Sequence, residues 1–267
     1  MKITFIGGGN MAGAILAGLA RQGGHVLQVV ELDAAKREQL ARDYGVAAFG
    51  AAPAFAADEV VVLAVKPQQL KAVCEGLAER LNGALVLSIA AGVRVDALSR
   101  WLGGHARIVR IMPNTPAMVG RGVSGIYAPQ GLAEADAQTA ATVMQAVGDV
   151  VSLPSETGID DITAVSGSGP AYVFYFIEAM IAGAVKQGFD AATARALVLG
   201  TFDGAVELAR QSPLDVATLR QNVTSKGGTT ERAIARFEQE GVKAAIAAGM
   251  DDCRARSIEL GQLLSQD

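Results

Sequence analysis

The first 22 residues constrain the fold of this chain more than any other segment. An apolar run at residues 2–6 leads directly into the glycine turn Gly7-x-Gly9-x-x-Ala12, and a stretch with helical periodicity follows up to Gln22. The first glycine allows a tight turn, the second lets the backbone approach a ligand because it lacks a Cβ, and the alanine lets the helix pack close to the strand. Free N–H groups at the helix start then face phosphates. The order strand, glycine turn, helix therefore predicts a dinucleotide-binding turn.

The next strand supports this prediction. Residues 26–30 form an apolar run that ends at Glu31, with Asp33 just after it. An acid at this distance from the glycine turn is expected to bond a ribose hydroxyl. Without such context the same spacing also fits a plain turn between a strand and a helix.

The first half of the chain alternates between strand and helix patterns. Continuous apolar runs at residues 60–65 and 84–89 are typical of parallel strands that are covered on both faces. Further strands are expected at residues 107–112, 123–127 and 149–153, and helices at 34–44 (with Asp33 as the N-cap), 68–81, 95–102 and 134–147. This alternation predicts an α/β fold with a Rossmann-type, doubly wound sheet.

The pattern changes after Leu153. From there only helices are expected, at residues 171–187, 191–210, 214–221, 231–239 and 242–264. We therefore expect two domains, a dinucleotide-binding domain at residues 1–157 and an all-helical substrate-binding and dimerisation domain at residues 158–267. Residues 164–185 carry a single charge and approach the length of a membrane span, but Ser166–Pro170 shortens the apolar helix. We expect that helix to be buried in the core of the second domain or in a subunit interface.

Composition excludes several classes of function. The net charge of −4 and the sequence pI of about 5.3 give no reason to expect nucleic acid or an anionic membrane as a partner. Cys74 and Cys253 lie far apart in the sequence and are expected to be buried thiols in a reducing compartment, with no disulfide and no metal site. The first strand begins at once, so no signal peptide is expected and the predicted location is the cytoplasm.

Candidates for acid–base or nucleophilic catalysis are sparse. The two histidines, His25 and His105, have no nearby acid in the sequence to orient them, and structural roles are expected for both. The sequence has no G-x-S-x-G, H-E-x-x-H or C-x-x-C motif, which argues against nucleophilic and zinc chemistry. Hydride transfer between a nicotinamide and a protonated C=N bond needs little from an acid or base, because the cofactor carries the difficult chemistry.

A polar loop at residues 222–230 is the best candidate for a substrate site. Consecutive free N–H groups around Ser225 to Thr229 are expected to form an anion nest, and Lys226 adds positive charge. Thr230 is expected to be the N-cap of the next helix, with Glu231 in its first turn. A capped interhelical loop without a binding role fits the same residues equally well.

Two further segments close strands at the carboxyl edge of the predicted sheet, where open α/β sheets bind ligands. In Ala64-Val-Lys-Pro67, Lys66 could reach a ribose or phosphate. In Met112-Pro-Asn-Thr-Pro116, Asn114 could bond a carboxamide or the substrate. Each segment alone also fits a plain turn.

Together these segments resemble the pyrroline-5-carboxylate reductase family over essentially the whole chain. The matching motifs are Phe5–Ala12, Ala64–Pro67, Ser88–Gly92, Arg110–Pro116, Val165–Val173 and Val223–Thr230. The resemblance implies reduction of 1-pyrroline-5-carboxylate to L-proline with NADPH or NADH, and no metal site is expected, since the sequence lacks metal-binding motifs. It also implies a helical domain that swaps into a tight homodimer, often assembled further into a decamer.

The resemblance also implies roles for individual residues. The backbone of Ser225, Gly227 and Gly228 would hold the substrate carboxylate, and Thr230 would place its hydroxyl near the ring nitrogen as the catalytic group. The predicted substrate-binding set is Ser225, Lys226, Gly227, Gly228, Thr229 and Thr230. The predicted cofactor-binding set is Ile6, Gly7, Gly9, Asn10, Met11, Ala12, Glu31, Ala64, Val65, Lys66, Pro67, Asn114 and Asn222.

The chain departs from the family pattern at two places. Many members have proline where this chain has Lys226, which makes the loop less rigid. NADPH-preferring members commonly have Asn-Arg or Ser-type residues after the second strand, where this chain has Glu31-Leu32-Asp33. A carboxylate there bonds a free ribose 2′-hydroxyl and repels a phosphate, although Lys36 and Arg37 could compensate. NADH preference or dual use is therefore expected.

Two other functions remain open on the sequence. A hydroxyacid-type dehydrogenase would share the fold but needs a lysine base soon after its G-x-x-G segment, whereas here Pro170 follows and Lys186 comes late. A non-catalytic nucleotide-binding or scaffold protein would keep the glycine turn without needing Thr230 and its loop.

Overall fold

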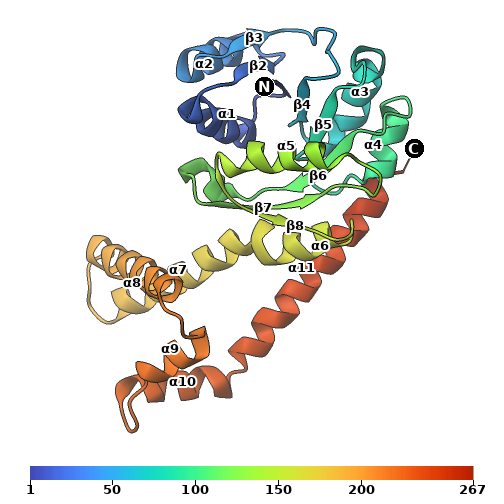
Figure 1. The fold of residues 1–267 in the computed structure, drawn as a ribbon. Coiled ribbons are helices and arrows are strands. Elements are labelled where there is room, and N and C mark those ends of the chain that lie inside the picture. The colour runs from blue at the N-terminus through green and yellow to red at the C-terminus, as the bar shows by residue number, and fades with distance from the viewer. Residues whose placement is uncertain (267) are drawn as a thin grey trace. The chain divides into compact units, whose positions relative to one another are not determined.

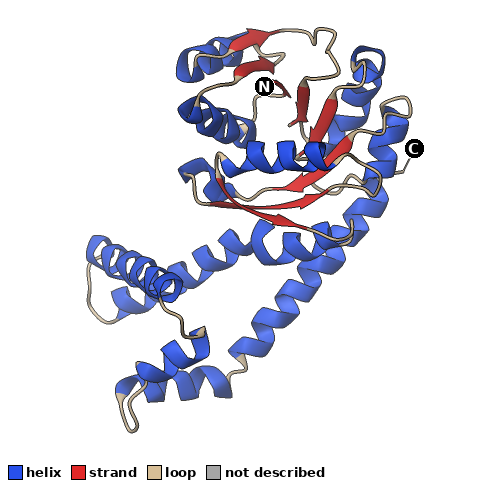
Figure 2. Cartoon of the chain, viewed as in Figure 1, coloured by secondary structure: helices blue, strands red, loops and turns tan. Residues whose placement is uncertain are grey.

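A computed structural model describes residues 1–266 as two compact units. Of the described residues, the first comprises 1–170 and 253–266, and the second comprises Ala171–Asp252. Every strand lies in the first unit, and the second is helical (Figures 1 and 2). The strands are β1 (Lys2–Ile6), β2 (Val26–Val30), β3 (Ala47–Phe49), β4 (Val60–Leu63), β5 (Leu85–Ser88), β6 (Ile108–Met112), β7 (Gly122–Tyr127) and β8 (Gly148–Ser152).

The helices cover both faces of the sheet and then form the second unit. They are α1 (Asn10–Gln22), α2 (Ala34–Tyr44), α3 (Pro67–Leu77), α4 (Val95–Trp101), α5 (Glu134–Gln145), α6 (Gly158–Ile162), α7 (Gly169–Lys186), α8 (Ala191–Gln211), α9 (Val216–Asn222), α10 (Thr229–Gln239) and α11 (Val242–Leu264). Short turns of other helical types are η1 (Ala78–Arg80), η2 (Thr115–Val119) and the π-helical η3 (Thr163–Gly167).

The eight strands form one sheet in the order β3-β2-β1-β4-β5-β6-β7-β8. All neighbouring pairs are parallel except β6 and β7, which are antiparallel. Only η2 and its flanking turns connect β6 to β7, and so short a connection is below the length that a parallel crossover needs. The predicted α/β, Rossmann-type fold is confirmed, and the sheet is mixed rather than wholly parallel.

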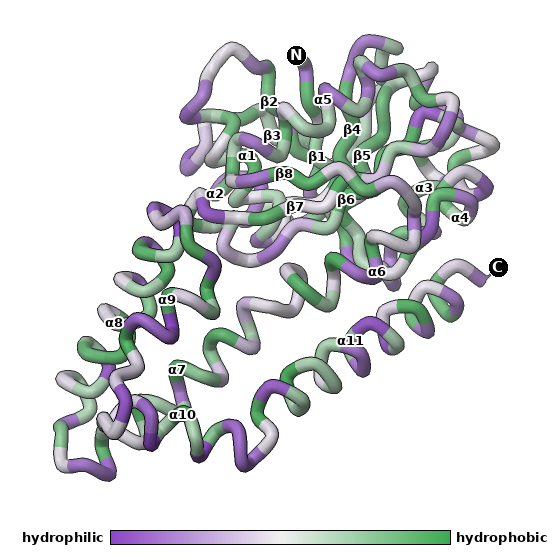
Figure 3. The backbone as a smooth tube through the Cα atoms, turned by 60° about the horizontal axis from the view of Figure 1, so that its bottom comes forward, coloured by the Kyte–Doolittle hydropathy of each residue, from purple (hydrophilic) through white to green (hydrophobic). Residues whose placement is uncertain are grey.

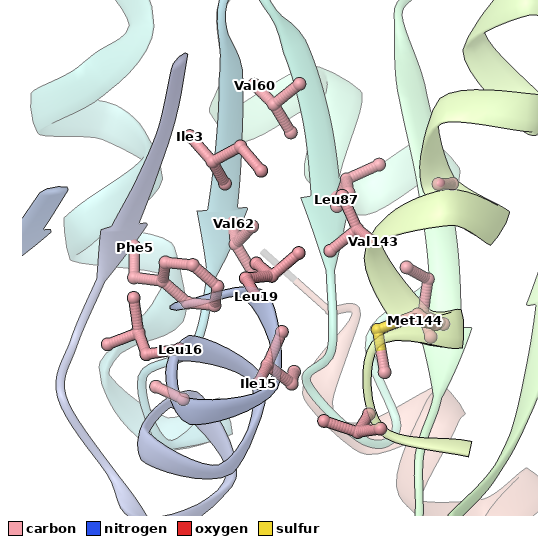
Figure 4. Close-up of a cluster of buried hydrophobic side chains, with 14 of the residues drawn as sticks. Ile3, Phe5, Ile15, Leu16, Leu19, Val60, Val62, Leu87, Val143 and Met144 are labelled. Carbon is pink, nitrogen blue, oxygen red and sulfur yellow. The ribbon is translucent and has the colours of Figure 1, made fainter. Parts of the chain in front are cut away.

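Two apolar clusters, one on each face of the sheet, form the core of the first unit. One contains Phe5 and Leu87 with residues of α1 and α5, among them Leu16 and Met144 (Figure 4). The other contains Val61 and Val86 with residues of α3 and α4. Successive residues of a strand point to opposite faces, so the continuous apolar runs fill both clusters. This arrangement holds the carboxyl ends of β1, β2 and β4 side by side.

Most element boundaries lie within two or three residues of the predicted ones. β1, β2 and α2 match in full, and the Asp33 side chain accepts a hydrogen bond from the Lys36 N–H as the N-cap of α2. The short strand β3 and the turn η2 were not predicted. β3 has only three residues, too few for a periodic signal to stand out.

The expected shortening of the apolar helix by Ser166–Pro170 is wrong, because helical structure extends through this segment up to a bend at Ser168 and resumes at Gly169. The π-helical turn η3 carries the chain from α6 toward α7, with the Thr163 hydroxyl donating to the Ile159 carbonyl at 2.6 Å. Residues 158–186 thus form a helical stretch long and apolar enough to cross a membrane by length and composition alone, with mean hydropathy 1.3 in an 18-residue window. The expected burial of α7 in a core of the second domain is also wrong, because none of its residues is buried in the single chain.

The second unit lacks a core of its own. Of residues 171–252, all of which the structure describes, only Ala194 and Val198 are buried. Large apolar side chains remain exposed, including Phe174 at 64% and Tyr175 at 71%. Hydrophobic segments recur along α7 and α8 in Figure 3. The alternative expectation, that α7 lies in a subunit interface, therefore remains.

The end of α11 belongs to the first unit. Ser257 donates to the buried carboxylate of Asp160 at 2.7 Å, and the Cys253 thiol donates to the Ser168 hydroxyl at 3.2 Å. The Arg94 N–H donates to the Ser265 hydroxyl at 3.2 Å. These bonds fix the C-terminal turns of α11 against α4, α6 and η3.

Candidate cofactor and substrate sites

The glycine turn follows β1 and meets the loop after β4. The Gly7 N–H donates to the Val30 carbonyl at 2.8 Å, which ties the turn to the end of β2. Gly7 has φ +95°, and a Cβ there would lie 2.9 Å from Val65 Cγ1 and 3.0 Å from the Ala64 carbonyl oxygen. Both the backbone conformation and the close approach require glycine at this position.

The start of α1 offers unpaired backbone donors. Gly9 is the N-cap, no side chain caps the helix, and its first turn has no acidic residue. The N–H groups of the first turn of a helix have no partner within the helix, and the helix dipole favours an anion there. Ala12 is fully buried, as the close packing of strand and helix requires. These residues fit the pyrophosphate of a dinucleotide.

A cavity of about 240 Å³ opens beside this turn. It is lined by Gly8, Gly9 and Asn10 and by residues of α1, α2 and η2, including Lys36 and Met118. Its volume suits part of a dinucleotide rather than the whole molecule.

The Glu31 carboxylate is anchored on the glycine turn. Its Oε2 accepts from the Gly8 N–H at 3.1 Å and lies 3.5 Å from Lys36 Nζ, while Oε1 accepts from the Asp33 N–H at 3.2 Å. Partial burial alone would raise the pKa of Glu31, but the backbone donors and the Lys36 ammonium outweigh it and lower the pKa. Glu31 is therefore ionised at neutral pH.

The two basic residues that could offset this charge are already engaged. Lys36 pairs with Glu31 itself, and Arg37 Nη1 donates to the carbonyl oxygens of Glu31 and Leu32 at 2.7 and 2.8 Å. The turn after β2 thus presents a fixed carboxylate, with its neighbouring cations directed to that carboxylate and to the backbone.

The loop after β4 lies beside the glycine turn. The Ala64 N–H donates to the Ile6 carbonyl at 2.9 Å, which continues the pairing of β1 and β4 by one residue. Lys66 is the exposed N-cap of α3, Pro67 is the first helical residue, and no side chain caps this helix. Val65 lies against Gly7, so this loop adjoins the glycine turn, whereas the residues that line the cavity come from the turn, α1, α2 and η2.

Asn114 has a structural role in this chain. It is 7% exposed, its Nδ2 donates to the Ser166 carbonyl at 3.0 Å, and its Oδ1 accepts from the Val123 N–H at 2.9 Å. The side chain thus joins the turn after β6 to β7 and to η3. Its predicted contact with the cofactor stays a prediction, and only part of its hydrogen-bonding capacity is left for one.

The loop at residues 222–230 lies in the second unit and differs from expectation in two respects. The Gly227 N–H, expected to be free, donates to Glu231 Oε2 at 2.6 Å, and the Gly228 N–H donates to the Ser225 carbonyl at 3.0 Å. Gly227 has φ +75°, which permits the sharp turn. The loop therefore already holds a carboxylate, one supplied by its own chain.

The predicted N-cap of α10 is also wrong. Gly228, with extended φ and ψ of −83° and 174°, is the N-cap, and no side chain caps the helix. Thr230 is the second helical residue and is half-buried. Its hydroxyl is therefore not required for capping, which leaves it for a ligand. Ser225, Lys226 and Thr229 are exposed, as is Asn222 at the end of α9.

A partly buried ion pair between the buried Arg110 and Glu156 was not predicted from the sequence. Arg110 Nη1 lies 2.7 Å from Glu156 Oε1, which also accepts from the Val95 N–H at 2.7 Å. The arginine within the apolar strand β6 was the available signal, since a buried arginine requires a partner. Ser88, which neighbours Arg110 in the sheet, is 1% exposed, and its hydroxyl has no partner among residues 1–266.

The cysteines and histidines lie outside these sites. Cys74 is buried, and burial raises the pKa of its thiol to about 12, whereas Cys253 is half-buried. Burial lowers the pKa of His105, and its Nε2 lies 2.9 Å from the Ala84 carbonyl oxygen. Within residues 1–266 no group of three or more His, Cys, Asp or Glu side chains is placed to hold a metal ion.

Family models match both parts of the chain. A model described as pyrroline-5-carboxylate reductase dimerisation matches residues 156–260, and one described as NADP oxidoreductase coenzyme F420-dependent matches residues 2–92. The first supports a homo-oligomer and the second an oxidoreductase.

Individual relatives match over nearly the full length. Pyrroline-5-carboxylate reductase of Pseudomonas aeruginosa is 42% identical, covering 99% of this chain and 98% of that protein. The enzyme of Pasteurella multocida is 43% identical, covering 98% of each. The solved structure of a pyrroline-5-carboxylate reductase from Coxiella burnetii has a TM-score of 0.90 at 39% identity, covering 97% of each chain.

More distant solved structures have lower sequence identity to this chain and lower TM-scores. Pyrroline carboxylate reductase of Plasmodium falciparum, solved with NADP bound, has a TM-score of 0.86 at 27% identity, covering 98% of each chain. Prephenate dehydrogenase from Aquifex aeolicus, at 13% identity and a TM-score of 0.54, shares the fold alone. The full-length identities decide the assignment: the chain belongs to the pyrroline-5-carboxylate reductase family of oxidoreductases.

Proposed function

We propose that this chain reduces 1-pyrroline-5-carboxylate to L-proline, the last step of proline biosynthesis, with NADH or NADPH as the hydride donor. The observation that carries the proposal is the identity of about two residues in five to pyrroline-5-carboxylate reductases over the whole chain. The glycine turn and the loop of residues 222–230 fall within the matched length. Bound NAD(P)H supplies the hydride to the C=N carbon, and the protein binds and orients the two reactants.

The first unit supplies the cofactor-binding residues. Gly7, Gly9 and Ala12 seat the pyrophosphate at the start of α1, and Glu31 bonds the ribose. The remaining residues assigned to the cofactor are Ile6, Asn10, Met11, Ala64, Val65, Lys66, Pro67 and Asn114, with Asn222 from the second unit. The uncapped start of α1 supports this assignment, because an anion there meets unpaired N–H groups.

The second unit supplies the substrate-binding residues. The backbone of Ser225, Gly227 and Gly228 holds the substrate carboxylate, and Lys226 and Thr229 flank it. Thr230 places its hydroxyl at the ring nitrogen and acts as the catalytic group. The bond from the Gly227 N–H to the Glu231 carboxylate supports this role, since one of the assigned donors is already bonded to a carboxylate.

We further propose NADH preference or dual use of the cofactors. Glu31 is fixed on the glycine turn as an anion that can accept from a ribose 2′-hydroxyl but repels a 2′-phosphate, while Lys36 and Arg37 are directed to Glu31 and to backbone carbonyls. The test is the ratio of kcat/KM for NADH to that for NADPH. A Glu31→Asn variant should shift the ratio toward NADPH, whereas Glu38→Gln, on the exposed side of α2, should leave it unchanged. A strong NADPH preference of the unmodified chain would contradict the proposal.

The assembly and the location complete the proposal. The functional domains are residues 1–157 and 158–267, and the second dimerises, with a decamer as the further assembly. The apolar stretch at residues 158–186 is then covered by a second copy rather than by lipid, and neither nucleic acid nor a membrane is a partner. The location is the cytoplasm, and the free thiols of Cys74 and Cys253 support a reducing compartment. Light scattering on the purified chain tests the assembly, and fractionation of cells tests the location.

The activity itself is tested by following oxidation of NADH and NADPH with 1-pyrroline-5-carboxylate. A ketone derived from a 2-hydroxy acid serves as the alternative substrate, because a hydroxyacid-type dehydrogenase would reduce it. Turnover of the cyclic imine and no turnover of the ketone is the expected result. Cofactor binding without turnover of either substrate would favour a non-catalytic protein.

A further inference from the structure

We propose that Glu231 is an internal competitor for the substrate carboxylate and sets the affinity of this enzyme for carboxylate-bearing imines. The inference rests on the proposed function of the loop at residues 222–230. Glu231 lies in the first turn of α10 and folds back so that its Oε2 accepts from the Gly227 N–H at 2.6 Å.

This contact is not a standard capping interaction. In a capping box the acid at the third helical position bonds the N–H of the N-cap residue, here Gly228. The Gly228 N–H instead donates to the Ser225 carbonyl within the turn, and the Glu231 side chain passes the N-cap to reach Gly227. The carboxylate therefore occupies a donor that the substrate carboxylate is proposed to use.

Two carboxylates sharing one N–H repel each other, so the substrate has to displace Glu231 before it binds. The displacement is feasible because Glu231 is exposed, and a side chain released there is solvated by water. The neighbouring cation does not hold Glu231 in place, since no ion pair between Lys226 and Glu231 occurs in the described part of the loop. Glu231 thus lowers the affinity for the substrate and leaves the hydride-transfer geometry untouched.

The inference distinguishes substrates by their carboxylate. An imine that carries a carboxylate competes with Glu231, whereas 1-pyrroline, the same ring without the carboxylate, does not use the Gly227 N–H. Glu231 should therefore lower the affinity for 1-pyrroline-5-carboxylate and leave the affinity for 1-pyrroline unchanged.

The test compares Glu231→Ala and Glu231→Gln with the unmodified full-length chain at saturating NADH. Removing the competitor should lower KM for 1-pyrroline-5-carboxylate about three- to tenfold, the range expected for one ordinary, solvent-exposed hydrogen bond, with kcat unchanged. Glu231→Gln keeps an acceptor but removes the charge, so its KM should fall between that of Glu231→Ala and that of the unmodified chain. Glu240→Gln, at the other end of α10, is the matched control and should change nothing.

The alternative is that Glu231 holds the loop in its binding form. In that case KM rises in Glu231→Ala, or kcat/KM for 1-pyrroline falls together with that for 1-pyrroline-5-carboxylate, and either result overturns the inference. An unchanged KM also overturns it. Calorimetric titration with L-proline gives a readout without turnover, and Glu231→Ala should bind it three- to tenfold more tightly than the unmodified chain. Failure of the unmodified chain to reduce 1-pyrroline-5-carboxylate would instead overturn the proposed function, and this inference with it.

Discussion

The two units of this chain differ most in how they bury apolar surface. The first has two clusters on either side of its sheet, with side chains such as Phe5 and Leu16 fully buried. The second buries only Ala194 and Val198 of residues 171–252, all of them described. A helical unit without a core needs a partner to cover its apolar faces. The difference indicates that the first unit is stable through its own packing and the second through association.

The largest effect is expected from charging the exposed face of α7. Phe174→Asp should abolish assembly at micromolar concentration, because a buried aromatic side chain at the centre of an interface contributes at least about 2 kcal/mol and a buried unpaired charge adds to the cost. Light scattering and sedimentation measure the change. Leu32→Asp, which charges an 84% exposed apolar residue of the first unit, is the control and should leave assembly intact. A Phe174→Asp variant that still assembles would show that this face is not the interface.

A core truncation in the first unit should destabilise it independently of assembly. Phe5→Ala removes a fully buried ring and should lower the free energy of unfolding by about 3–5 kcal/mol. Urea unfolding at two protein concentrations should give the same loss at both. If the loss varied with concentration, the first unit would also depend on association.

Gly7→Ala should weaken cofactor binding. The new Cβ would meet Val65 Cγ1 and the Ala64 carbonyl, and φ of +95° is strained for alanine, at a cost of about 1–3 kcal/mol. The dissociation constant for NADH should therefore rise about tenfold or more. Gly24→Ala shares a positive φ of +74° but has no atom within 4 Å of the added Cβ, so it should leave NADH binding unchanged. Equal effects of the two substitutions would argue against a role for the close approach.

Thr230→Ala tests the part of the chemistry that the second unit supplies. The loss of one hydrogen bond to the ring nitrogen should cost about 1–2 kcal/mol and lower kcat/KM roughly five- to thirtyfold. Thr201→Ala, which removes an exposed hydroxyl of α8 that donates to the Leu197 carbonyl, serves as the control. Since Gly228 rather than Thr230 is the N-cap, the stability of α10 should not change, and an unchanged kcat/KM would remove Thr230 from the catalytic site.

The smallest effect is expected from the titration of Glu31. Its pKa is lowered in the folded chain, so its contribution to stability is present above the ordinary pKa of glutamate and is lost as the pH falls through the lowered value. The contribution should be under about 1 kcal/mol because the carboxylate and Lys36 are partly exposed. The unmodified chain should lose slightly more stability than Glu31→Gln between neutral and acid pH. If the unmodified chain and Glu31→Gln lost the same stability between neutral and acid pH, this account of the Glu31 carboxylate would be contradicted.

The sequence predicted the first unit better than the second, for a physical reason. Apolar runs and the spacing of Gly7, Gly9 and Ala12 reflect local rules, and β1, β2 and α2 follow them in full. The π-helical continuation through Ser166 depends on side chain to backbone bonds one turn apart, such as that of Thr163, and periodicity does not report them. The sequence left open whether a domain core or a subunit interface covers α7, because an apolar sequence specifies that a face must be covered, not by which chain.

The candidate sites were likewise predictable only where local sequence rules determine the position of a residue. The position of Glu31 beside the glycine turn was predictable, because the spacing from strand to strand fixes it. The contact of Glu231 with Gly227 depends on φ of +75° at Gly227 and on the turn from Ser225 to Gly228. The sequence placed Glu231 in the first turn of a helix but gave no sign that its carboxylate reaches the backbone of the preceding loop.

Equilibrium unfolding with two probes tests the central comparison most directly. Trp101 is the single tryptophan, lies in α4 and is 6% exposed, so its fluorescence reports the first unit, whereas α8 to α10 contribute to the helical circular dichroism from the second. On dilution, the dichroism transition should shift to lower urea while the fluorescence transition stays in place. Two coincident transitions that do not move with protein concentration would contradict the account.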